Sequence, residues 1–256
     1  MVSAIIVAAG SSRRMGFDKL FASLAGKPVV MHSICAFEKC DVVSDIVVVT
    51  KNERIAEFEK FVADEELRKV RKIIAGGDER HLSVWEGLRA VNAKAEFIAI
   101  HDGARPLTTP EMIRDCFALA RETGAACCAS LIPDTLKRAD ESRIVSESVE
   151  RSGLWAMQTP QIFSSALILQ AYAGVIATHE LVTDEVSAVQ RLGKKIALLR
   201  NDEWNFKITL PRDLELAEHV LSTRTRARRK KQPKEQTKRN ARKSEQKENK
   251  AKASGQ

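Results

Sequence analysis

Basic residues follow a short apolar run close to the N-terminus. The run Ile5–Val7 leads into the small residues Ala8–Gly10, and Arg14 and Lys19 come next. Small residues at the end of a strand let a ligand lie against the backbone, whose N–H groups can bind phosphate oxygens. The stretch matches neither the Walker pattern nor the dinucleotide-binding fingerprint. It therefore predicts a phosphate site of another kind, with a solvated basic turn as the alternative.

A second polar cluster begins with two adjacent glycines. Gly76 and Gly77 precede Asp78, and Ser83 lies one turn into the amphipathic stretch that follows. Paired glycines allow a sharp turn, and a carboxylate with a hydroxyl can accept and donate hydrogen bonds at the edge of a nucleobase. The alternative is that Asp78 caps a helix that begins at Glu79. Both interpretations are compatible with the sequence.

A third cluster combines an acid and a base at the end of another apolar run. Asp102 and Arg105 are three residues apart, with His101 before them and Gly103 between them. A strand end in an open α/β sheet is where such folds bind ligands. An internal ion pair that stabilises the loop is the alternative. We expect His101 to be a packed residue at the end of the strand, without a catalytic role.

Four further polar residues are candidates, although each position is ambiguous by itself. They are Thr135, Arg151, Thr159 and Lys207. The stretch that holds Thr135 and Arg151 is charged, and such stretches are usually solvated. Lys207 could equally be an ordinary surface lysine.

Short apolar strands alternate with amphipathic helices over most of the chain. We expect strands over residues 4–8, 45–50, 70–75, 96–101, 125–131 and 195–200, and helices over 28–37, 54–62, 81–91, 110–122, 164–177, 183–192 and 211–221. This alternation predicts an α/β fold with a mostly parallel sheet, covered on both faces. Right-handed crossovers place the loops that follow the strands at one edge. Residues 133–155 are polar and irregular, and they predict an extended arm.

The net charge of +8 belongs to the C-terminus. Residues 222–256 contain 14 Lys and Arg and three Glu, a net charge of +11, so residues 1–221 carry −3. We therefore expect one folded domain over residues 1–221 and a disordered basic tail over 222–256, because the tail has too few apolar residues to offset the entropy of ordering. Nucleic-acid binding through the tail is an alternative of another class, although the tail lacks aromatic residues for base stacking.

Apolar runs and cysteines exclude several classes of protein. The apolar runs are far shorter than the roughly 20 residues that a membrane helix needs, and no signal peptide is evident. A cytoplasmic protein is therefore expected. Five cysteines, two of them adjacent, form neither a metal-ligand pattern nor a disulfide framework. We expect them to be small apolar core residues, and no protein residue is assigned to a metal.

Eight motifs occur in an order that resembles one known family. They are AAGSSRRMG with Lys19, GGDER with Ser83, HDGARP, PDTLKR, ERSGLW, QTPQ, TDEVSA and NFKITLP. Together they resemble the 2-C-methyl-D-erythritol 4-phosphate cytidylyltransferases of non-mevalonate isoprenoid biosynthesis, from Ile5 to about Leu221. The resemblance implies a Rossmann-like sheet of the nucleotide-diphospho-sugar transferase type. It also implies a homodimer, in which the arm over 133–155 reaches the partner subunit.

The same resemblance implies an activity and a set of site residues. The enzyme would transfer a cytidylyl group from CTP to the sugar-alcohol phosphate and release pyrophosphate, with Mg²⁺ on the CTP phosphates. Arg14, Lys19, Arg151 and Lys207 would be catalytic, with Arg151 supplied by the partner subunit. The substrate-binding residues would be Ala8, Ala9, Gly10, Gly77, Asp78, Ser83, Asp102, Gly103, Arg105, Thr135 and Thr159.

Two departures and one rival accompany the resemblance. The family commonly has glycine where Ser11 and Ser12 stand in this sequence. Its closing motif often has a basic residue near the position of Leu210, and that residue is absent here. The rival is ribitol-5-phosphate cytidylyltransferase, which shares the fold. HDGARP, GLW before QTPQ, and TDE favour the isoprenoid type.

Overall fold

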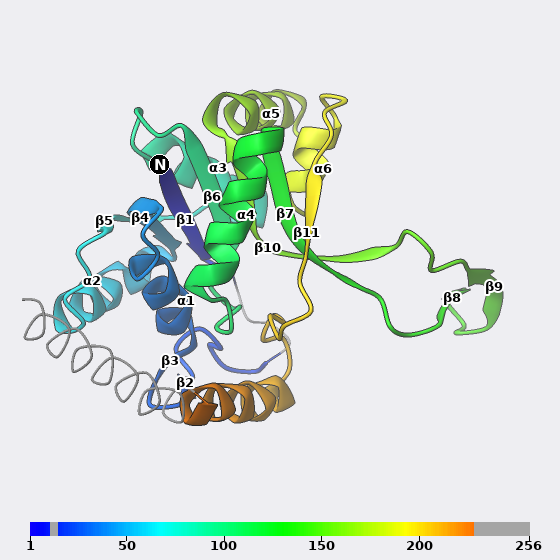
Figure 1. The fold of residues 1–256 in the computed structure, drawn as a ribbon, viewed down its shortest axis with the longest axis horizontal. Coiled ribbons are helices and arrows are strands. Elements are labelled where there is room, and N and C mark those ends of the chain that lie inside the picture. The colour runs from blue at the N-terminus through cyan, green and yellow to red at the C-terminus, as the bar shows by residue number, and fades with distance from the viewer. Residues whose placement is uncertain (11–14, 228–256) are drawn as a thin grey trace, which may run out of the picture.

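Seven strands form one twisted sheet in the centre of the molecule. The computed structural model describes residues 1–10 and 15–227. The strand order is β11-β7-β10-β6-β1-β4-β5, which Figure 1 shows as a layer between helices. The strands are β1 (Val2–Ala8), β4 (Val43–Thr50), β5 (Val70–Ala75), β6 (Phe97–Asp102), β7 (Ala125–Leu131), β10 (Trp155–Ser164) and β11 (Ala197–Arg200). All neighbours pair in parallel except β10, which is antiparallel to β6 and β7. The predicted α/β fold with a mostly parallel sheet is confirmed.

Helices cover both faces of this sheet because its strands are apolar on both sides. The helices are α1 (Val29–Glu38), α2 (Ile55–Asp64), α3 (Arg80–Ala90), α4 (Pro110–Thr123), α5 (Ser165–Thr178) and α6 (Glu185–Gln190). Ala4 and Ile6 of β1 belong to a core with α1, α2 and α4. Ile5 belongs to a second core with α3, α5 and α6. Successive side chains of a strand point to opposite faces, so an unbroken apolar strand needs both layers.

Local signals fix the ends of some helices. The Thr109 side chain accepts a hydrogen bond from the backbone N–H of Met112, and Pro110 occupies the first turn of α4. Gly124 ends that helix with a φ of +82°, a left-handed conformation that glycine adopts without a steric penalty. Three short elements complete the fold. Two short strands, β2 (Ser23–Leu24) and β3 (Lys27–Pro28), precede α1, and a 3-10 turn (Asn52–Arg54) precedes α2.

Strand β10 was not predicted from the sequence. It lies inside the sheet and contains Pro160, which lacks the N–H that a ladder hydrogen bond needs. The structure accommodates the proline at an irregularity, since pairing with β7 skips from Met157 to Gln161. Pairing with β6 begins at Gln161. Only the folded sheet provides the two neighbours between which this segment becomes a strand.

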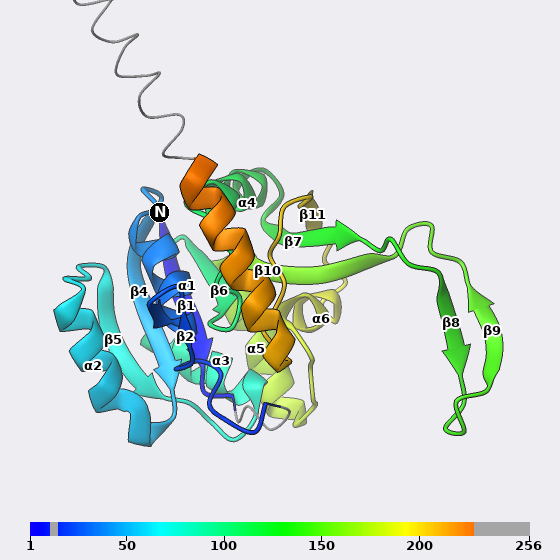
Figure 2. The same ribbon diagram turned by 90° about the horizontal axis from the view of Figure 1, so that it is seen from below.

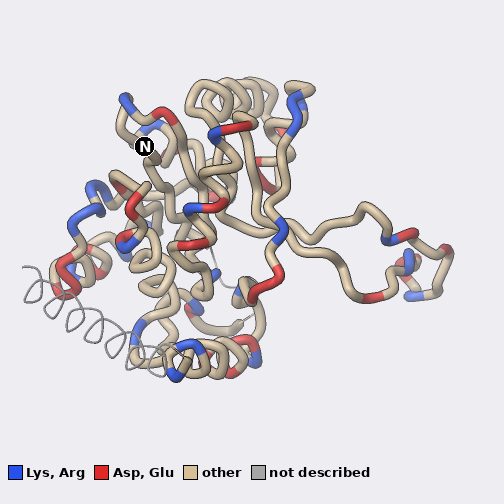
Figure 3. The backbone as a smooth tube through the Cα atoms, in the orientation of Figure 1, with Lys and Arg blue, Asp and Glu red and all other residues tan. Residues whose placement is uncertain are grey.

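Residues between β7 and β10 leave the body of the molecule as a hairpin. Strands β8 (Leu136–Ala139) and β9 (Val145–Val149) pair with each other and not with the central sheet. Figure 2 shows them well away from the helices and the sheet, and Figure 3 shows charges of both signs at their tip. Both strands lie within residues 133–155, and the predicted role of this segment as an arm to a partner subunit stays a prediction.

The C-terminal helix extends beyond the predicted boundary. It covers residues 211–227, so the expectation of disorder from residue 222 is wrong for residues 222–227. Arg224 explains the difference, because its guanidinium donates to the carbonyl oxygens of Leu107 (2.6 Å) and Trp204 (3.0 Å). Residues 228–256, the rest of the predicted tail, lie outside the described residues.

The cysteines contribute to the apolar interior. All five cysteines are free thiols, and Cys40, Cys116, Cys127 and Cys128 are buried, as expected of apolar core residues. Among the described helices, none has the length and apolar composition to cross a membrane.

A chain of hydrogen bonds joins β6 to β10 beneath the end of the sheet. The Asp102 N–H donates to Thr159 Oγ1 (3.1 Å), and Thr159 Oγ1 lies 2.9 Å from His101 Nδ1. His101 Nε2 lies 3.3 Å from the carbonyl oxygen of Arg105. A carbonyl can only accept, so we assign the ring proton to Nε2 and the Thr159 hydroxyl donates to Nδ1. His101 is thus a packed, neutral residue that orients the backbone at Asp102.

This arrangement predicts a pH-dependent stability. Burial lowers the pKa of His101 to about 3 in the folded protein. In the unfolded chain the pKa of a histidine side chain is about 6.5. The unfolded state therefore binds the proton more readily between these values, and stability falls as the pH falls below 6.5. Between pH 7 and pH 5 the loss from His101 is about 2 kcal/mol.

Urea unfolding of the native protein and of His101→Gln at both pH values measures this contribution. The native protein should lose about 2 kcal/mol more than the variant between pH 7 and pH 5. Equal losses would show that His101 is not held neutral in the folded state.

Candidate active site

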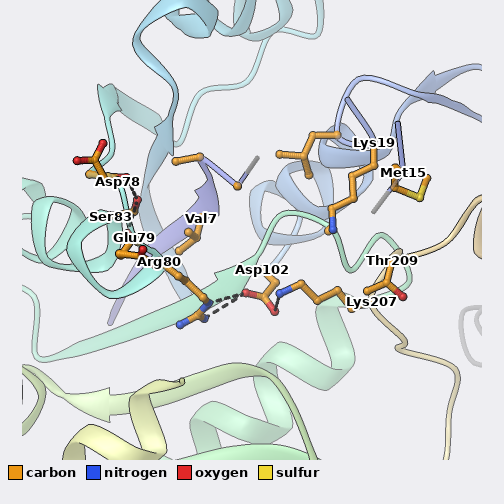
Figure 4. A pocket seen from close by; sticks show the side chains of 15 residues that line it. Val7, Met15, Lys19, Asp78, Glu79, Arg80, Ser83, Asp102, Lys207 and Thr209 are labelled. Carbon is orange, nitrogen blue, oxygen red and sulfur yellow. Dashed lines mark hydrogen bonds and ion pairs between the residues drawn. The ribbon is translucent and has the colours of Figure 1, made fainter. Parts of the chain in front are cut away.

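One pocket collects most of the residues singled out in the sequence. It has a volume of about 500 Å³ and lies at the carboxyl ends of β1, β5 and β6. Its lining comes from the loops after these strands and from the segment before the C-terminal helix: Val7, Ala9, Gly10, Met15, Lys19, Leu20, Gly77, Asp78, Glu79, Arg80, Ser83, Asp102, Ala104, Lys207 and Thr209. Figure 4 shows these side chains surrounding one space. An open α/β sheet binds ligands at this edge because the loops after its parallel strands meet there.

The predicted residues divide into four groups. Those that line the pocket are Ala9, Gly10, Lys19, Gly77, Asp78, Ser83, Asp102 and Lys207. Ala8, Gly103, Arg105 and Thr159 lie behind the lining and are mostly buried. Thr135 and Arg151 are on the protruding arm, where the Arg151 guanidinium donates to the carbonyl oxygen of Pro133 (2.5 Å). Arg14 lies outside the described residues, as do Ser11 and Ser12.

Two glycines let the loop after β5 pack closely on α3. A Cβ at Gly76 would lie 2.6 Å from Ser83 Oγ, and one at Gly77 would lie 2.5 Å from Leu82 Cβ. The Ser83 hydroxyl is shared between the carbonyl oxygens of Gly77 and Glu79, both at 3.1 Å. This packing explains why both glycines precede the helix.

Asp78 does not cap α3. The capping position belongs to Glu79, and no side chain bonds to the free N–H groups there, so the alternative that Asp78 is a helix cap is wrong. Asp78 lines the pocket instead. In Figure 4 it lies at the opposite end from Lys19 and Lys207.

Asp102 is a buried carboxylate among three cations. Its Oδ1 lies 3.1 Å from Arg80 Nε, and its Oδ2 lies 3.0 Å from Lys207 Nζ. Arg105 Nε is 3.5 Å from the same Oδ2. Burial disfavours the charged carboxylate, but the charges of Arg80, Lys207 and Arg105 outweigh it and hold the pKa of Asp102 well below its ordinary value. Asp102 is therefore ionised throughout the physiological range.

Arg105 joins three separate parts of the chain. Besides its ion pair with Asp102, its guanidinium donates to the carbonyl oxygens of Asn205 (2.9 Å) and Met157 (3.4 Å). The internal ion pair proposed as an alternative is therefore present. Arg105 holds the loop after β6 against β10 and the segment that carries Lys207.

Backbone contacts place Lys207 beside β6. The Ile208 N–H donates to the carbonyl oxygen of Ala104 (2.8 Å), and the Asn205 side-chain amide donates to that of Thr159 (2.8 Å). Lys207 is therefore fixed at the end of the central strand, although about 100 residues separate the two in sequence. In Figure 4 the Lys19 side chain extends into the pocket, and the Lys207 ammonium reaches the Asp102 carboxylate.

Arg80 is a pocket residue to which the sequence analysis gave no role. Its guanidinium binds both oxygens of Glu185, at 2.6 and 3.1 Å, in addition to Asp102. Glu185 is completely buried and also accepts a hydrogen bond from the Tyr172 hydroxyl (3.0 Å). Burial opposes the charge on Arg80, but Glu185 and Asp102 raise its pKa well above the ordinary value. Arg80 belongs to GGDER and Glu185 to TDEVSA, so two recognised motifs meet here.

The chemistry of the pocket suits a phosphorylated ligand. Two lysines face a space bounded by the small residues Ala9 and Gly10, and such loops can offer backbone N–H groups to phosphate oxygens. In the described residues, no group of three His, Cys, Asp or Glu side chains could hold a metal ion.

Comparison with known proteins gives a consistent result. The family model for 2-C-methyl-D-erythritol 4-phosphate cytidylyltransferase matches residues 2–223. The protein of that name from Caldanaerobacter subterraneus is 41% identical over 223 residues, which cover 86% of this chain and 98% of the relative. The protein of the same name from Halalkalibacterium halodurans is 39% identical over 226 residues, which cover 88% of this chain and 98% of that relative.

Solved structures support the same relationship. The crystal structure of 4-diphosphocytidyl-2C-methyl-D-erythritol synthase from Anaerococcus prevotii superposes with a TM-score of 0.77 at 26% identity. It covers 87% of this chain and 96% of that one. The relatives named here do not favour the ribitol-5-phosphate alternative. On the match over residues 2–223, this chain belongs to the 2-C-methyl-D-erythritol 4-phosphate cytidylyltransferase family.

Proposed function

We propose that this protein transfers a cytidylyl group from CTP to 2-C-methyl-D-erythritol 4-phosphate and releases pyrophosphate. The products are 4-diphosphocytidyl-2-C-methyl-D-erythritol and pyrophosphate, in non-mevalonate isoprenoid biosynthesis. One observation carries the proposal: Lys19 and Lys207, far apart in the sequence, line one pocket, in which Lys207 pairs with the ionised Asp102. Membership of the family supports the identity of both substrates.

The pocket has room for a nucleotide along its length. We infer that the cytosine lies near Gly77, Asp78 and Ser83, where the close-packed glycine turn leaves backbone groups and a carboxylate facing the ligand. The triphosphate would then extend along the first loop, past Ala8, Ala9 and Gly10, toward Lys19. Arg14 belongs to that loop and would add a second positive charge.

Charge neutralisation is the main task of such a site. The phosphate oxygen of the acceptor attacks the α-phosphorus of CTP, and pyrophosphate leaves in line. Two unit negative charges 4 Å apart repel each other by roughly 4 kcal/mol at an effective dielectric constant near 20. Arg14, Lys19 and Lys207 offset this repulsion and stabilise the charge that develops on the transferred phosphoryl group. A phosphate monoester is already a nucleophile, so the reaction needs no general base, and His101 remains neutral and packed.

A magnesium ion fits this pocket as a companion of CTP. Both oxygens of Asp102 already contact cations, and the described residues offer no three-ligand cluster. Mg²⁺ commonly keeps several of its waters and binds substrate phosphates, so the triphosphate itself would supply most of its ligands. When bound, the ion would neutralise charge on the triphosphate.

The acceptor would occupy the part of the pocket next to Asp102 and Lys207. Gly103, Arg105 and Thr159 lie behind this part, and we propose that they act by holding Asp102 in place. The Thr159 hydroxyl accepts a hydrogen bond from the Asp102 N–H, and Arg105 contacts the Asp102 carboxylate.

We propose that the enzyme is a homodimer in which the arm completes the partner's site. The arm extends away from its own body (Figure 1), and both Thr135 and Arg151 on it are exposed. Neither residue lines the pocket of its own chain. In a two-fold dimer each arm can reach the other subunit reciprocally, which would bring Arg151 and Thr135 to the acceptor.

Substrate identity is tested by the release of pyrophosphate from each of the four nucleoside triphosphates with Mg²⁺ present. Methylerythritol phosphate and ribitol 5-phosphate serve as acceptors. We expect turnover with CTP and methylerythritol phosphate, and far slower turnover with the other pairs. Preference for ribitol 5-phosphate, or for another nucleotide, would refute the proposed substrates.

Removal of one positive charge should slow the chemical step. We expect Lys19→Ala, Lys207→Ala and Arg14→Ala each to reduce kcat by on the order of 100-fold, with far-UV circular dichroism unchanged. Lys60→Ala, an exposed substitution on α2, is the matched control and should retain native turnover. A variant that keeps native kcat would remove its residue from the catalytic set.

Action of Arg151 across the dimer is tested by complementation. Arg151→Ala and Lys19→Ala should each be nearly inactive alone. Co-expression forms mixed dimers in which one pocket has Lys19 and receives an intact Arg151, so roughly a quarter of native activity should return. If Arg151 served its own subunit, co-expression would restore nothing.

A further inference from the structure

We propose that Glu185, together with Tyr172, is a positioning residue that holds Arg80 on one oxygen of Asp102 and so leaves the other oxygen to Lys207 and Arg105. This inference rests on the proposed function. Glu185 does not line the pocket, so it would act on the reaction only through Arg80. Tyr172 lies one step further from the substrates.

Contacts on two sides fix the Arg80 guanidinium. Its Nη1 and Nη2 bind the two oxygens of Glu185, and its Nε binds Asp102 Oδ1. Bidentate arginine–carboxylate pairs fix both the position and the plane of the guanidinium. Glu185 therefore determines where Nε lies, and Nε in turn determines the direction of the Asp102 carboxylate.

Glu185 is itself held rigidly. It is the first residue of α6, and the preceding Asp184 caps that helix by accepting the N–H of Ser187 (2.9 Å). The Tyr172 hydroxyl, from α5, donates to Glu185 Oε1 (3.0 Å). Burial raises the pKa of Tyr172, so this hydroxyl keeps its proton and remains a donor.

A count of charges shows what Glu185 contributes. Three cations, Arg80, Arg105 and Lys207, share two carboxylates, Asp102 and Glu185. The cluster therefore has a surplus of one positive charge. Arg80 and Lys207 line the pocket and Arg105 does not, and Arg80 is held by both oxygens of Glu185. This surplus is available to a phosphate.

Loss of the Glu185 charge would redistribute these contacts. Arg80 would then keep a single carboxylate partner in a partly buried place, where a poorly paired charge is costly. It would be drawn further onto Asp102 and would compete with Lys207 for that carboxylate. The Lys207 ammonium would lose its fixed position relative to the reacting phosphates, and a small misplacement of a catalytic group costs rate rather than nucleotide binding.

Steady-state kinetics of Glu185→Gln and Tyr172→Phe test this inference. We expect kcat to fall about tenfold or more in Glu185→Gln and roughly two- to threefold in Tyr172→Phe. The KM for CTP should stay within about twofold of native, because Glu185 contacts none of the residues assigned to CTP. Calorimetric titration with CTP should show a native number of binding sites in both variants.

Val189→Ala is the matched structural control. Val189 is buried in the same helix, α6, but contributes to the apolar core. Its truncation should lower the melting temperature without lowering kcat per CTP-binding site. A purely structural role for Glu185 predicts the same pattern in Glu185→Gln, and that pattern would refute the inference.

The remaining outcomes are also decisive. Native kcat in Glu185→Gln would overturn the positioning role while leaving the proposed function intact. A wild-type protein without cytidylyltransferase activity would overturn the proposed function and the positioning role together. If Glu185→Gln does not fold, Tyr172→Phe decides alone. In that case a lower kcat with unchanged CTP affinity supports the inference, and unchanged kcat refutes it.

Discussion

A carboxylate buried between three cations holds the candidate site together. Asp102 ends the central strand β6, and Arg80, Arg105 and Lys207 approach it from three other parts of the chain. The Asp102 carboxylate depends on these cations, since an isolated buried charge is costly. Asp102 therefore makes the loop after β5, the loop after β6 and the segment before the C-terminal helix depend on one another. The pocket lies where these segments meet.

The same cluster separates structural charges from those that face the ligand. Arg105 and Arg80 are largely occupied by carbonyl oxygens and by Glu185, whereas the Lys19 side chain extends into the pocket (Figure 4) and Lys207 lines it beside Asp102. For the two anionic substrates proposed here this division is useful, because the anchored guanidiniums fix the geometry while the lysines would contact phosphate. The neutral His101 fits the same scheme, since it orients the backbone of Asp102 without adding charge.

Most elements of the fold follow from local patterns in the sequence. Predicted strands at 70–75 and 125–131 match β5 and β7. The strand β7 is an almost unbroken apolar run, as expected of a buried strand, whereas the edge strand β5 carries the exposed residues Arg71 and Lys72. Strand β10 was missed because Pro160 normally argues against a central strand, and only its neighbours β6 and β7 show that the proline falls at a break in the pairing. The helix over 211–227 continues past an apparently polar boundary because Arg224 binds two carbonyl oxygens of distant loops.

Residue types and their order determined the fold class and the family, because each depends on short stretches of sequence, and they predict phosphate binding by the first loop. The sequence also named both Arg80 and Glu185, within GGDER and TDEVSA, without indicating that they touch. Their bond joins residues 105 positions apart, and such a pairing depends on how α3 and α6 pack on the sheet. Only the tertiary structure could therefore decide which charges serve the pocket and which hold it in place.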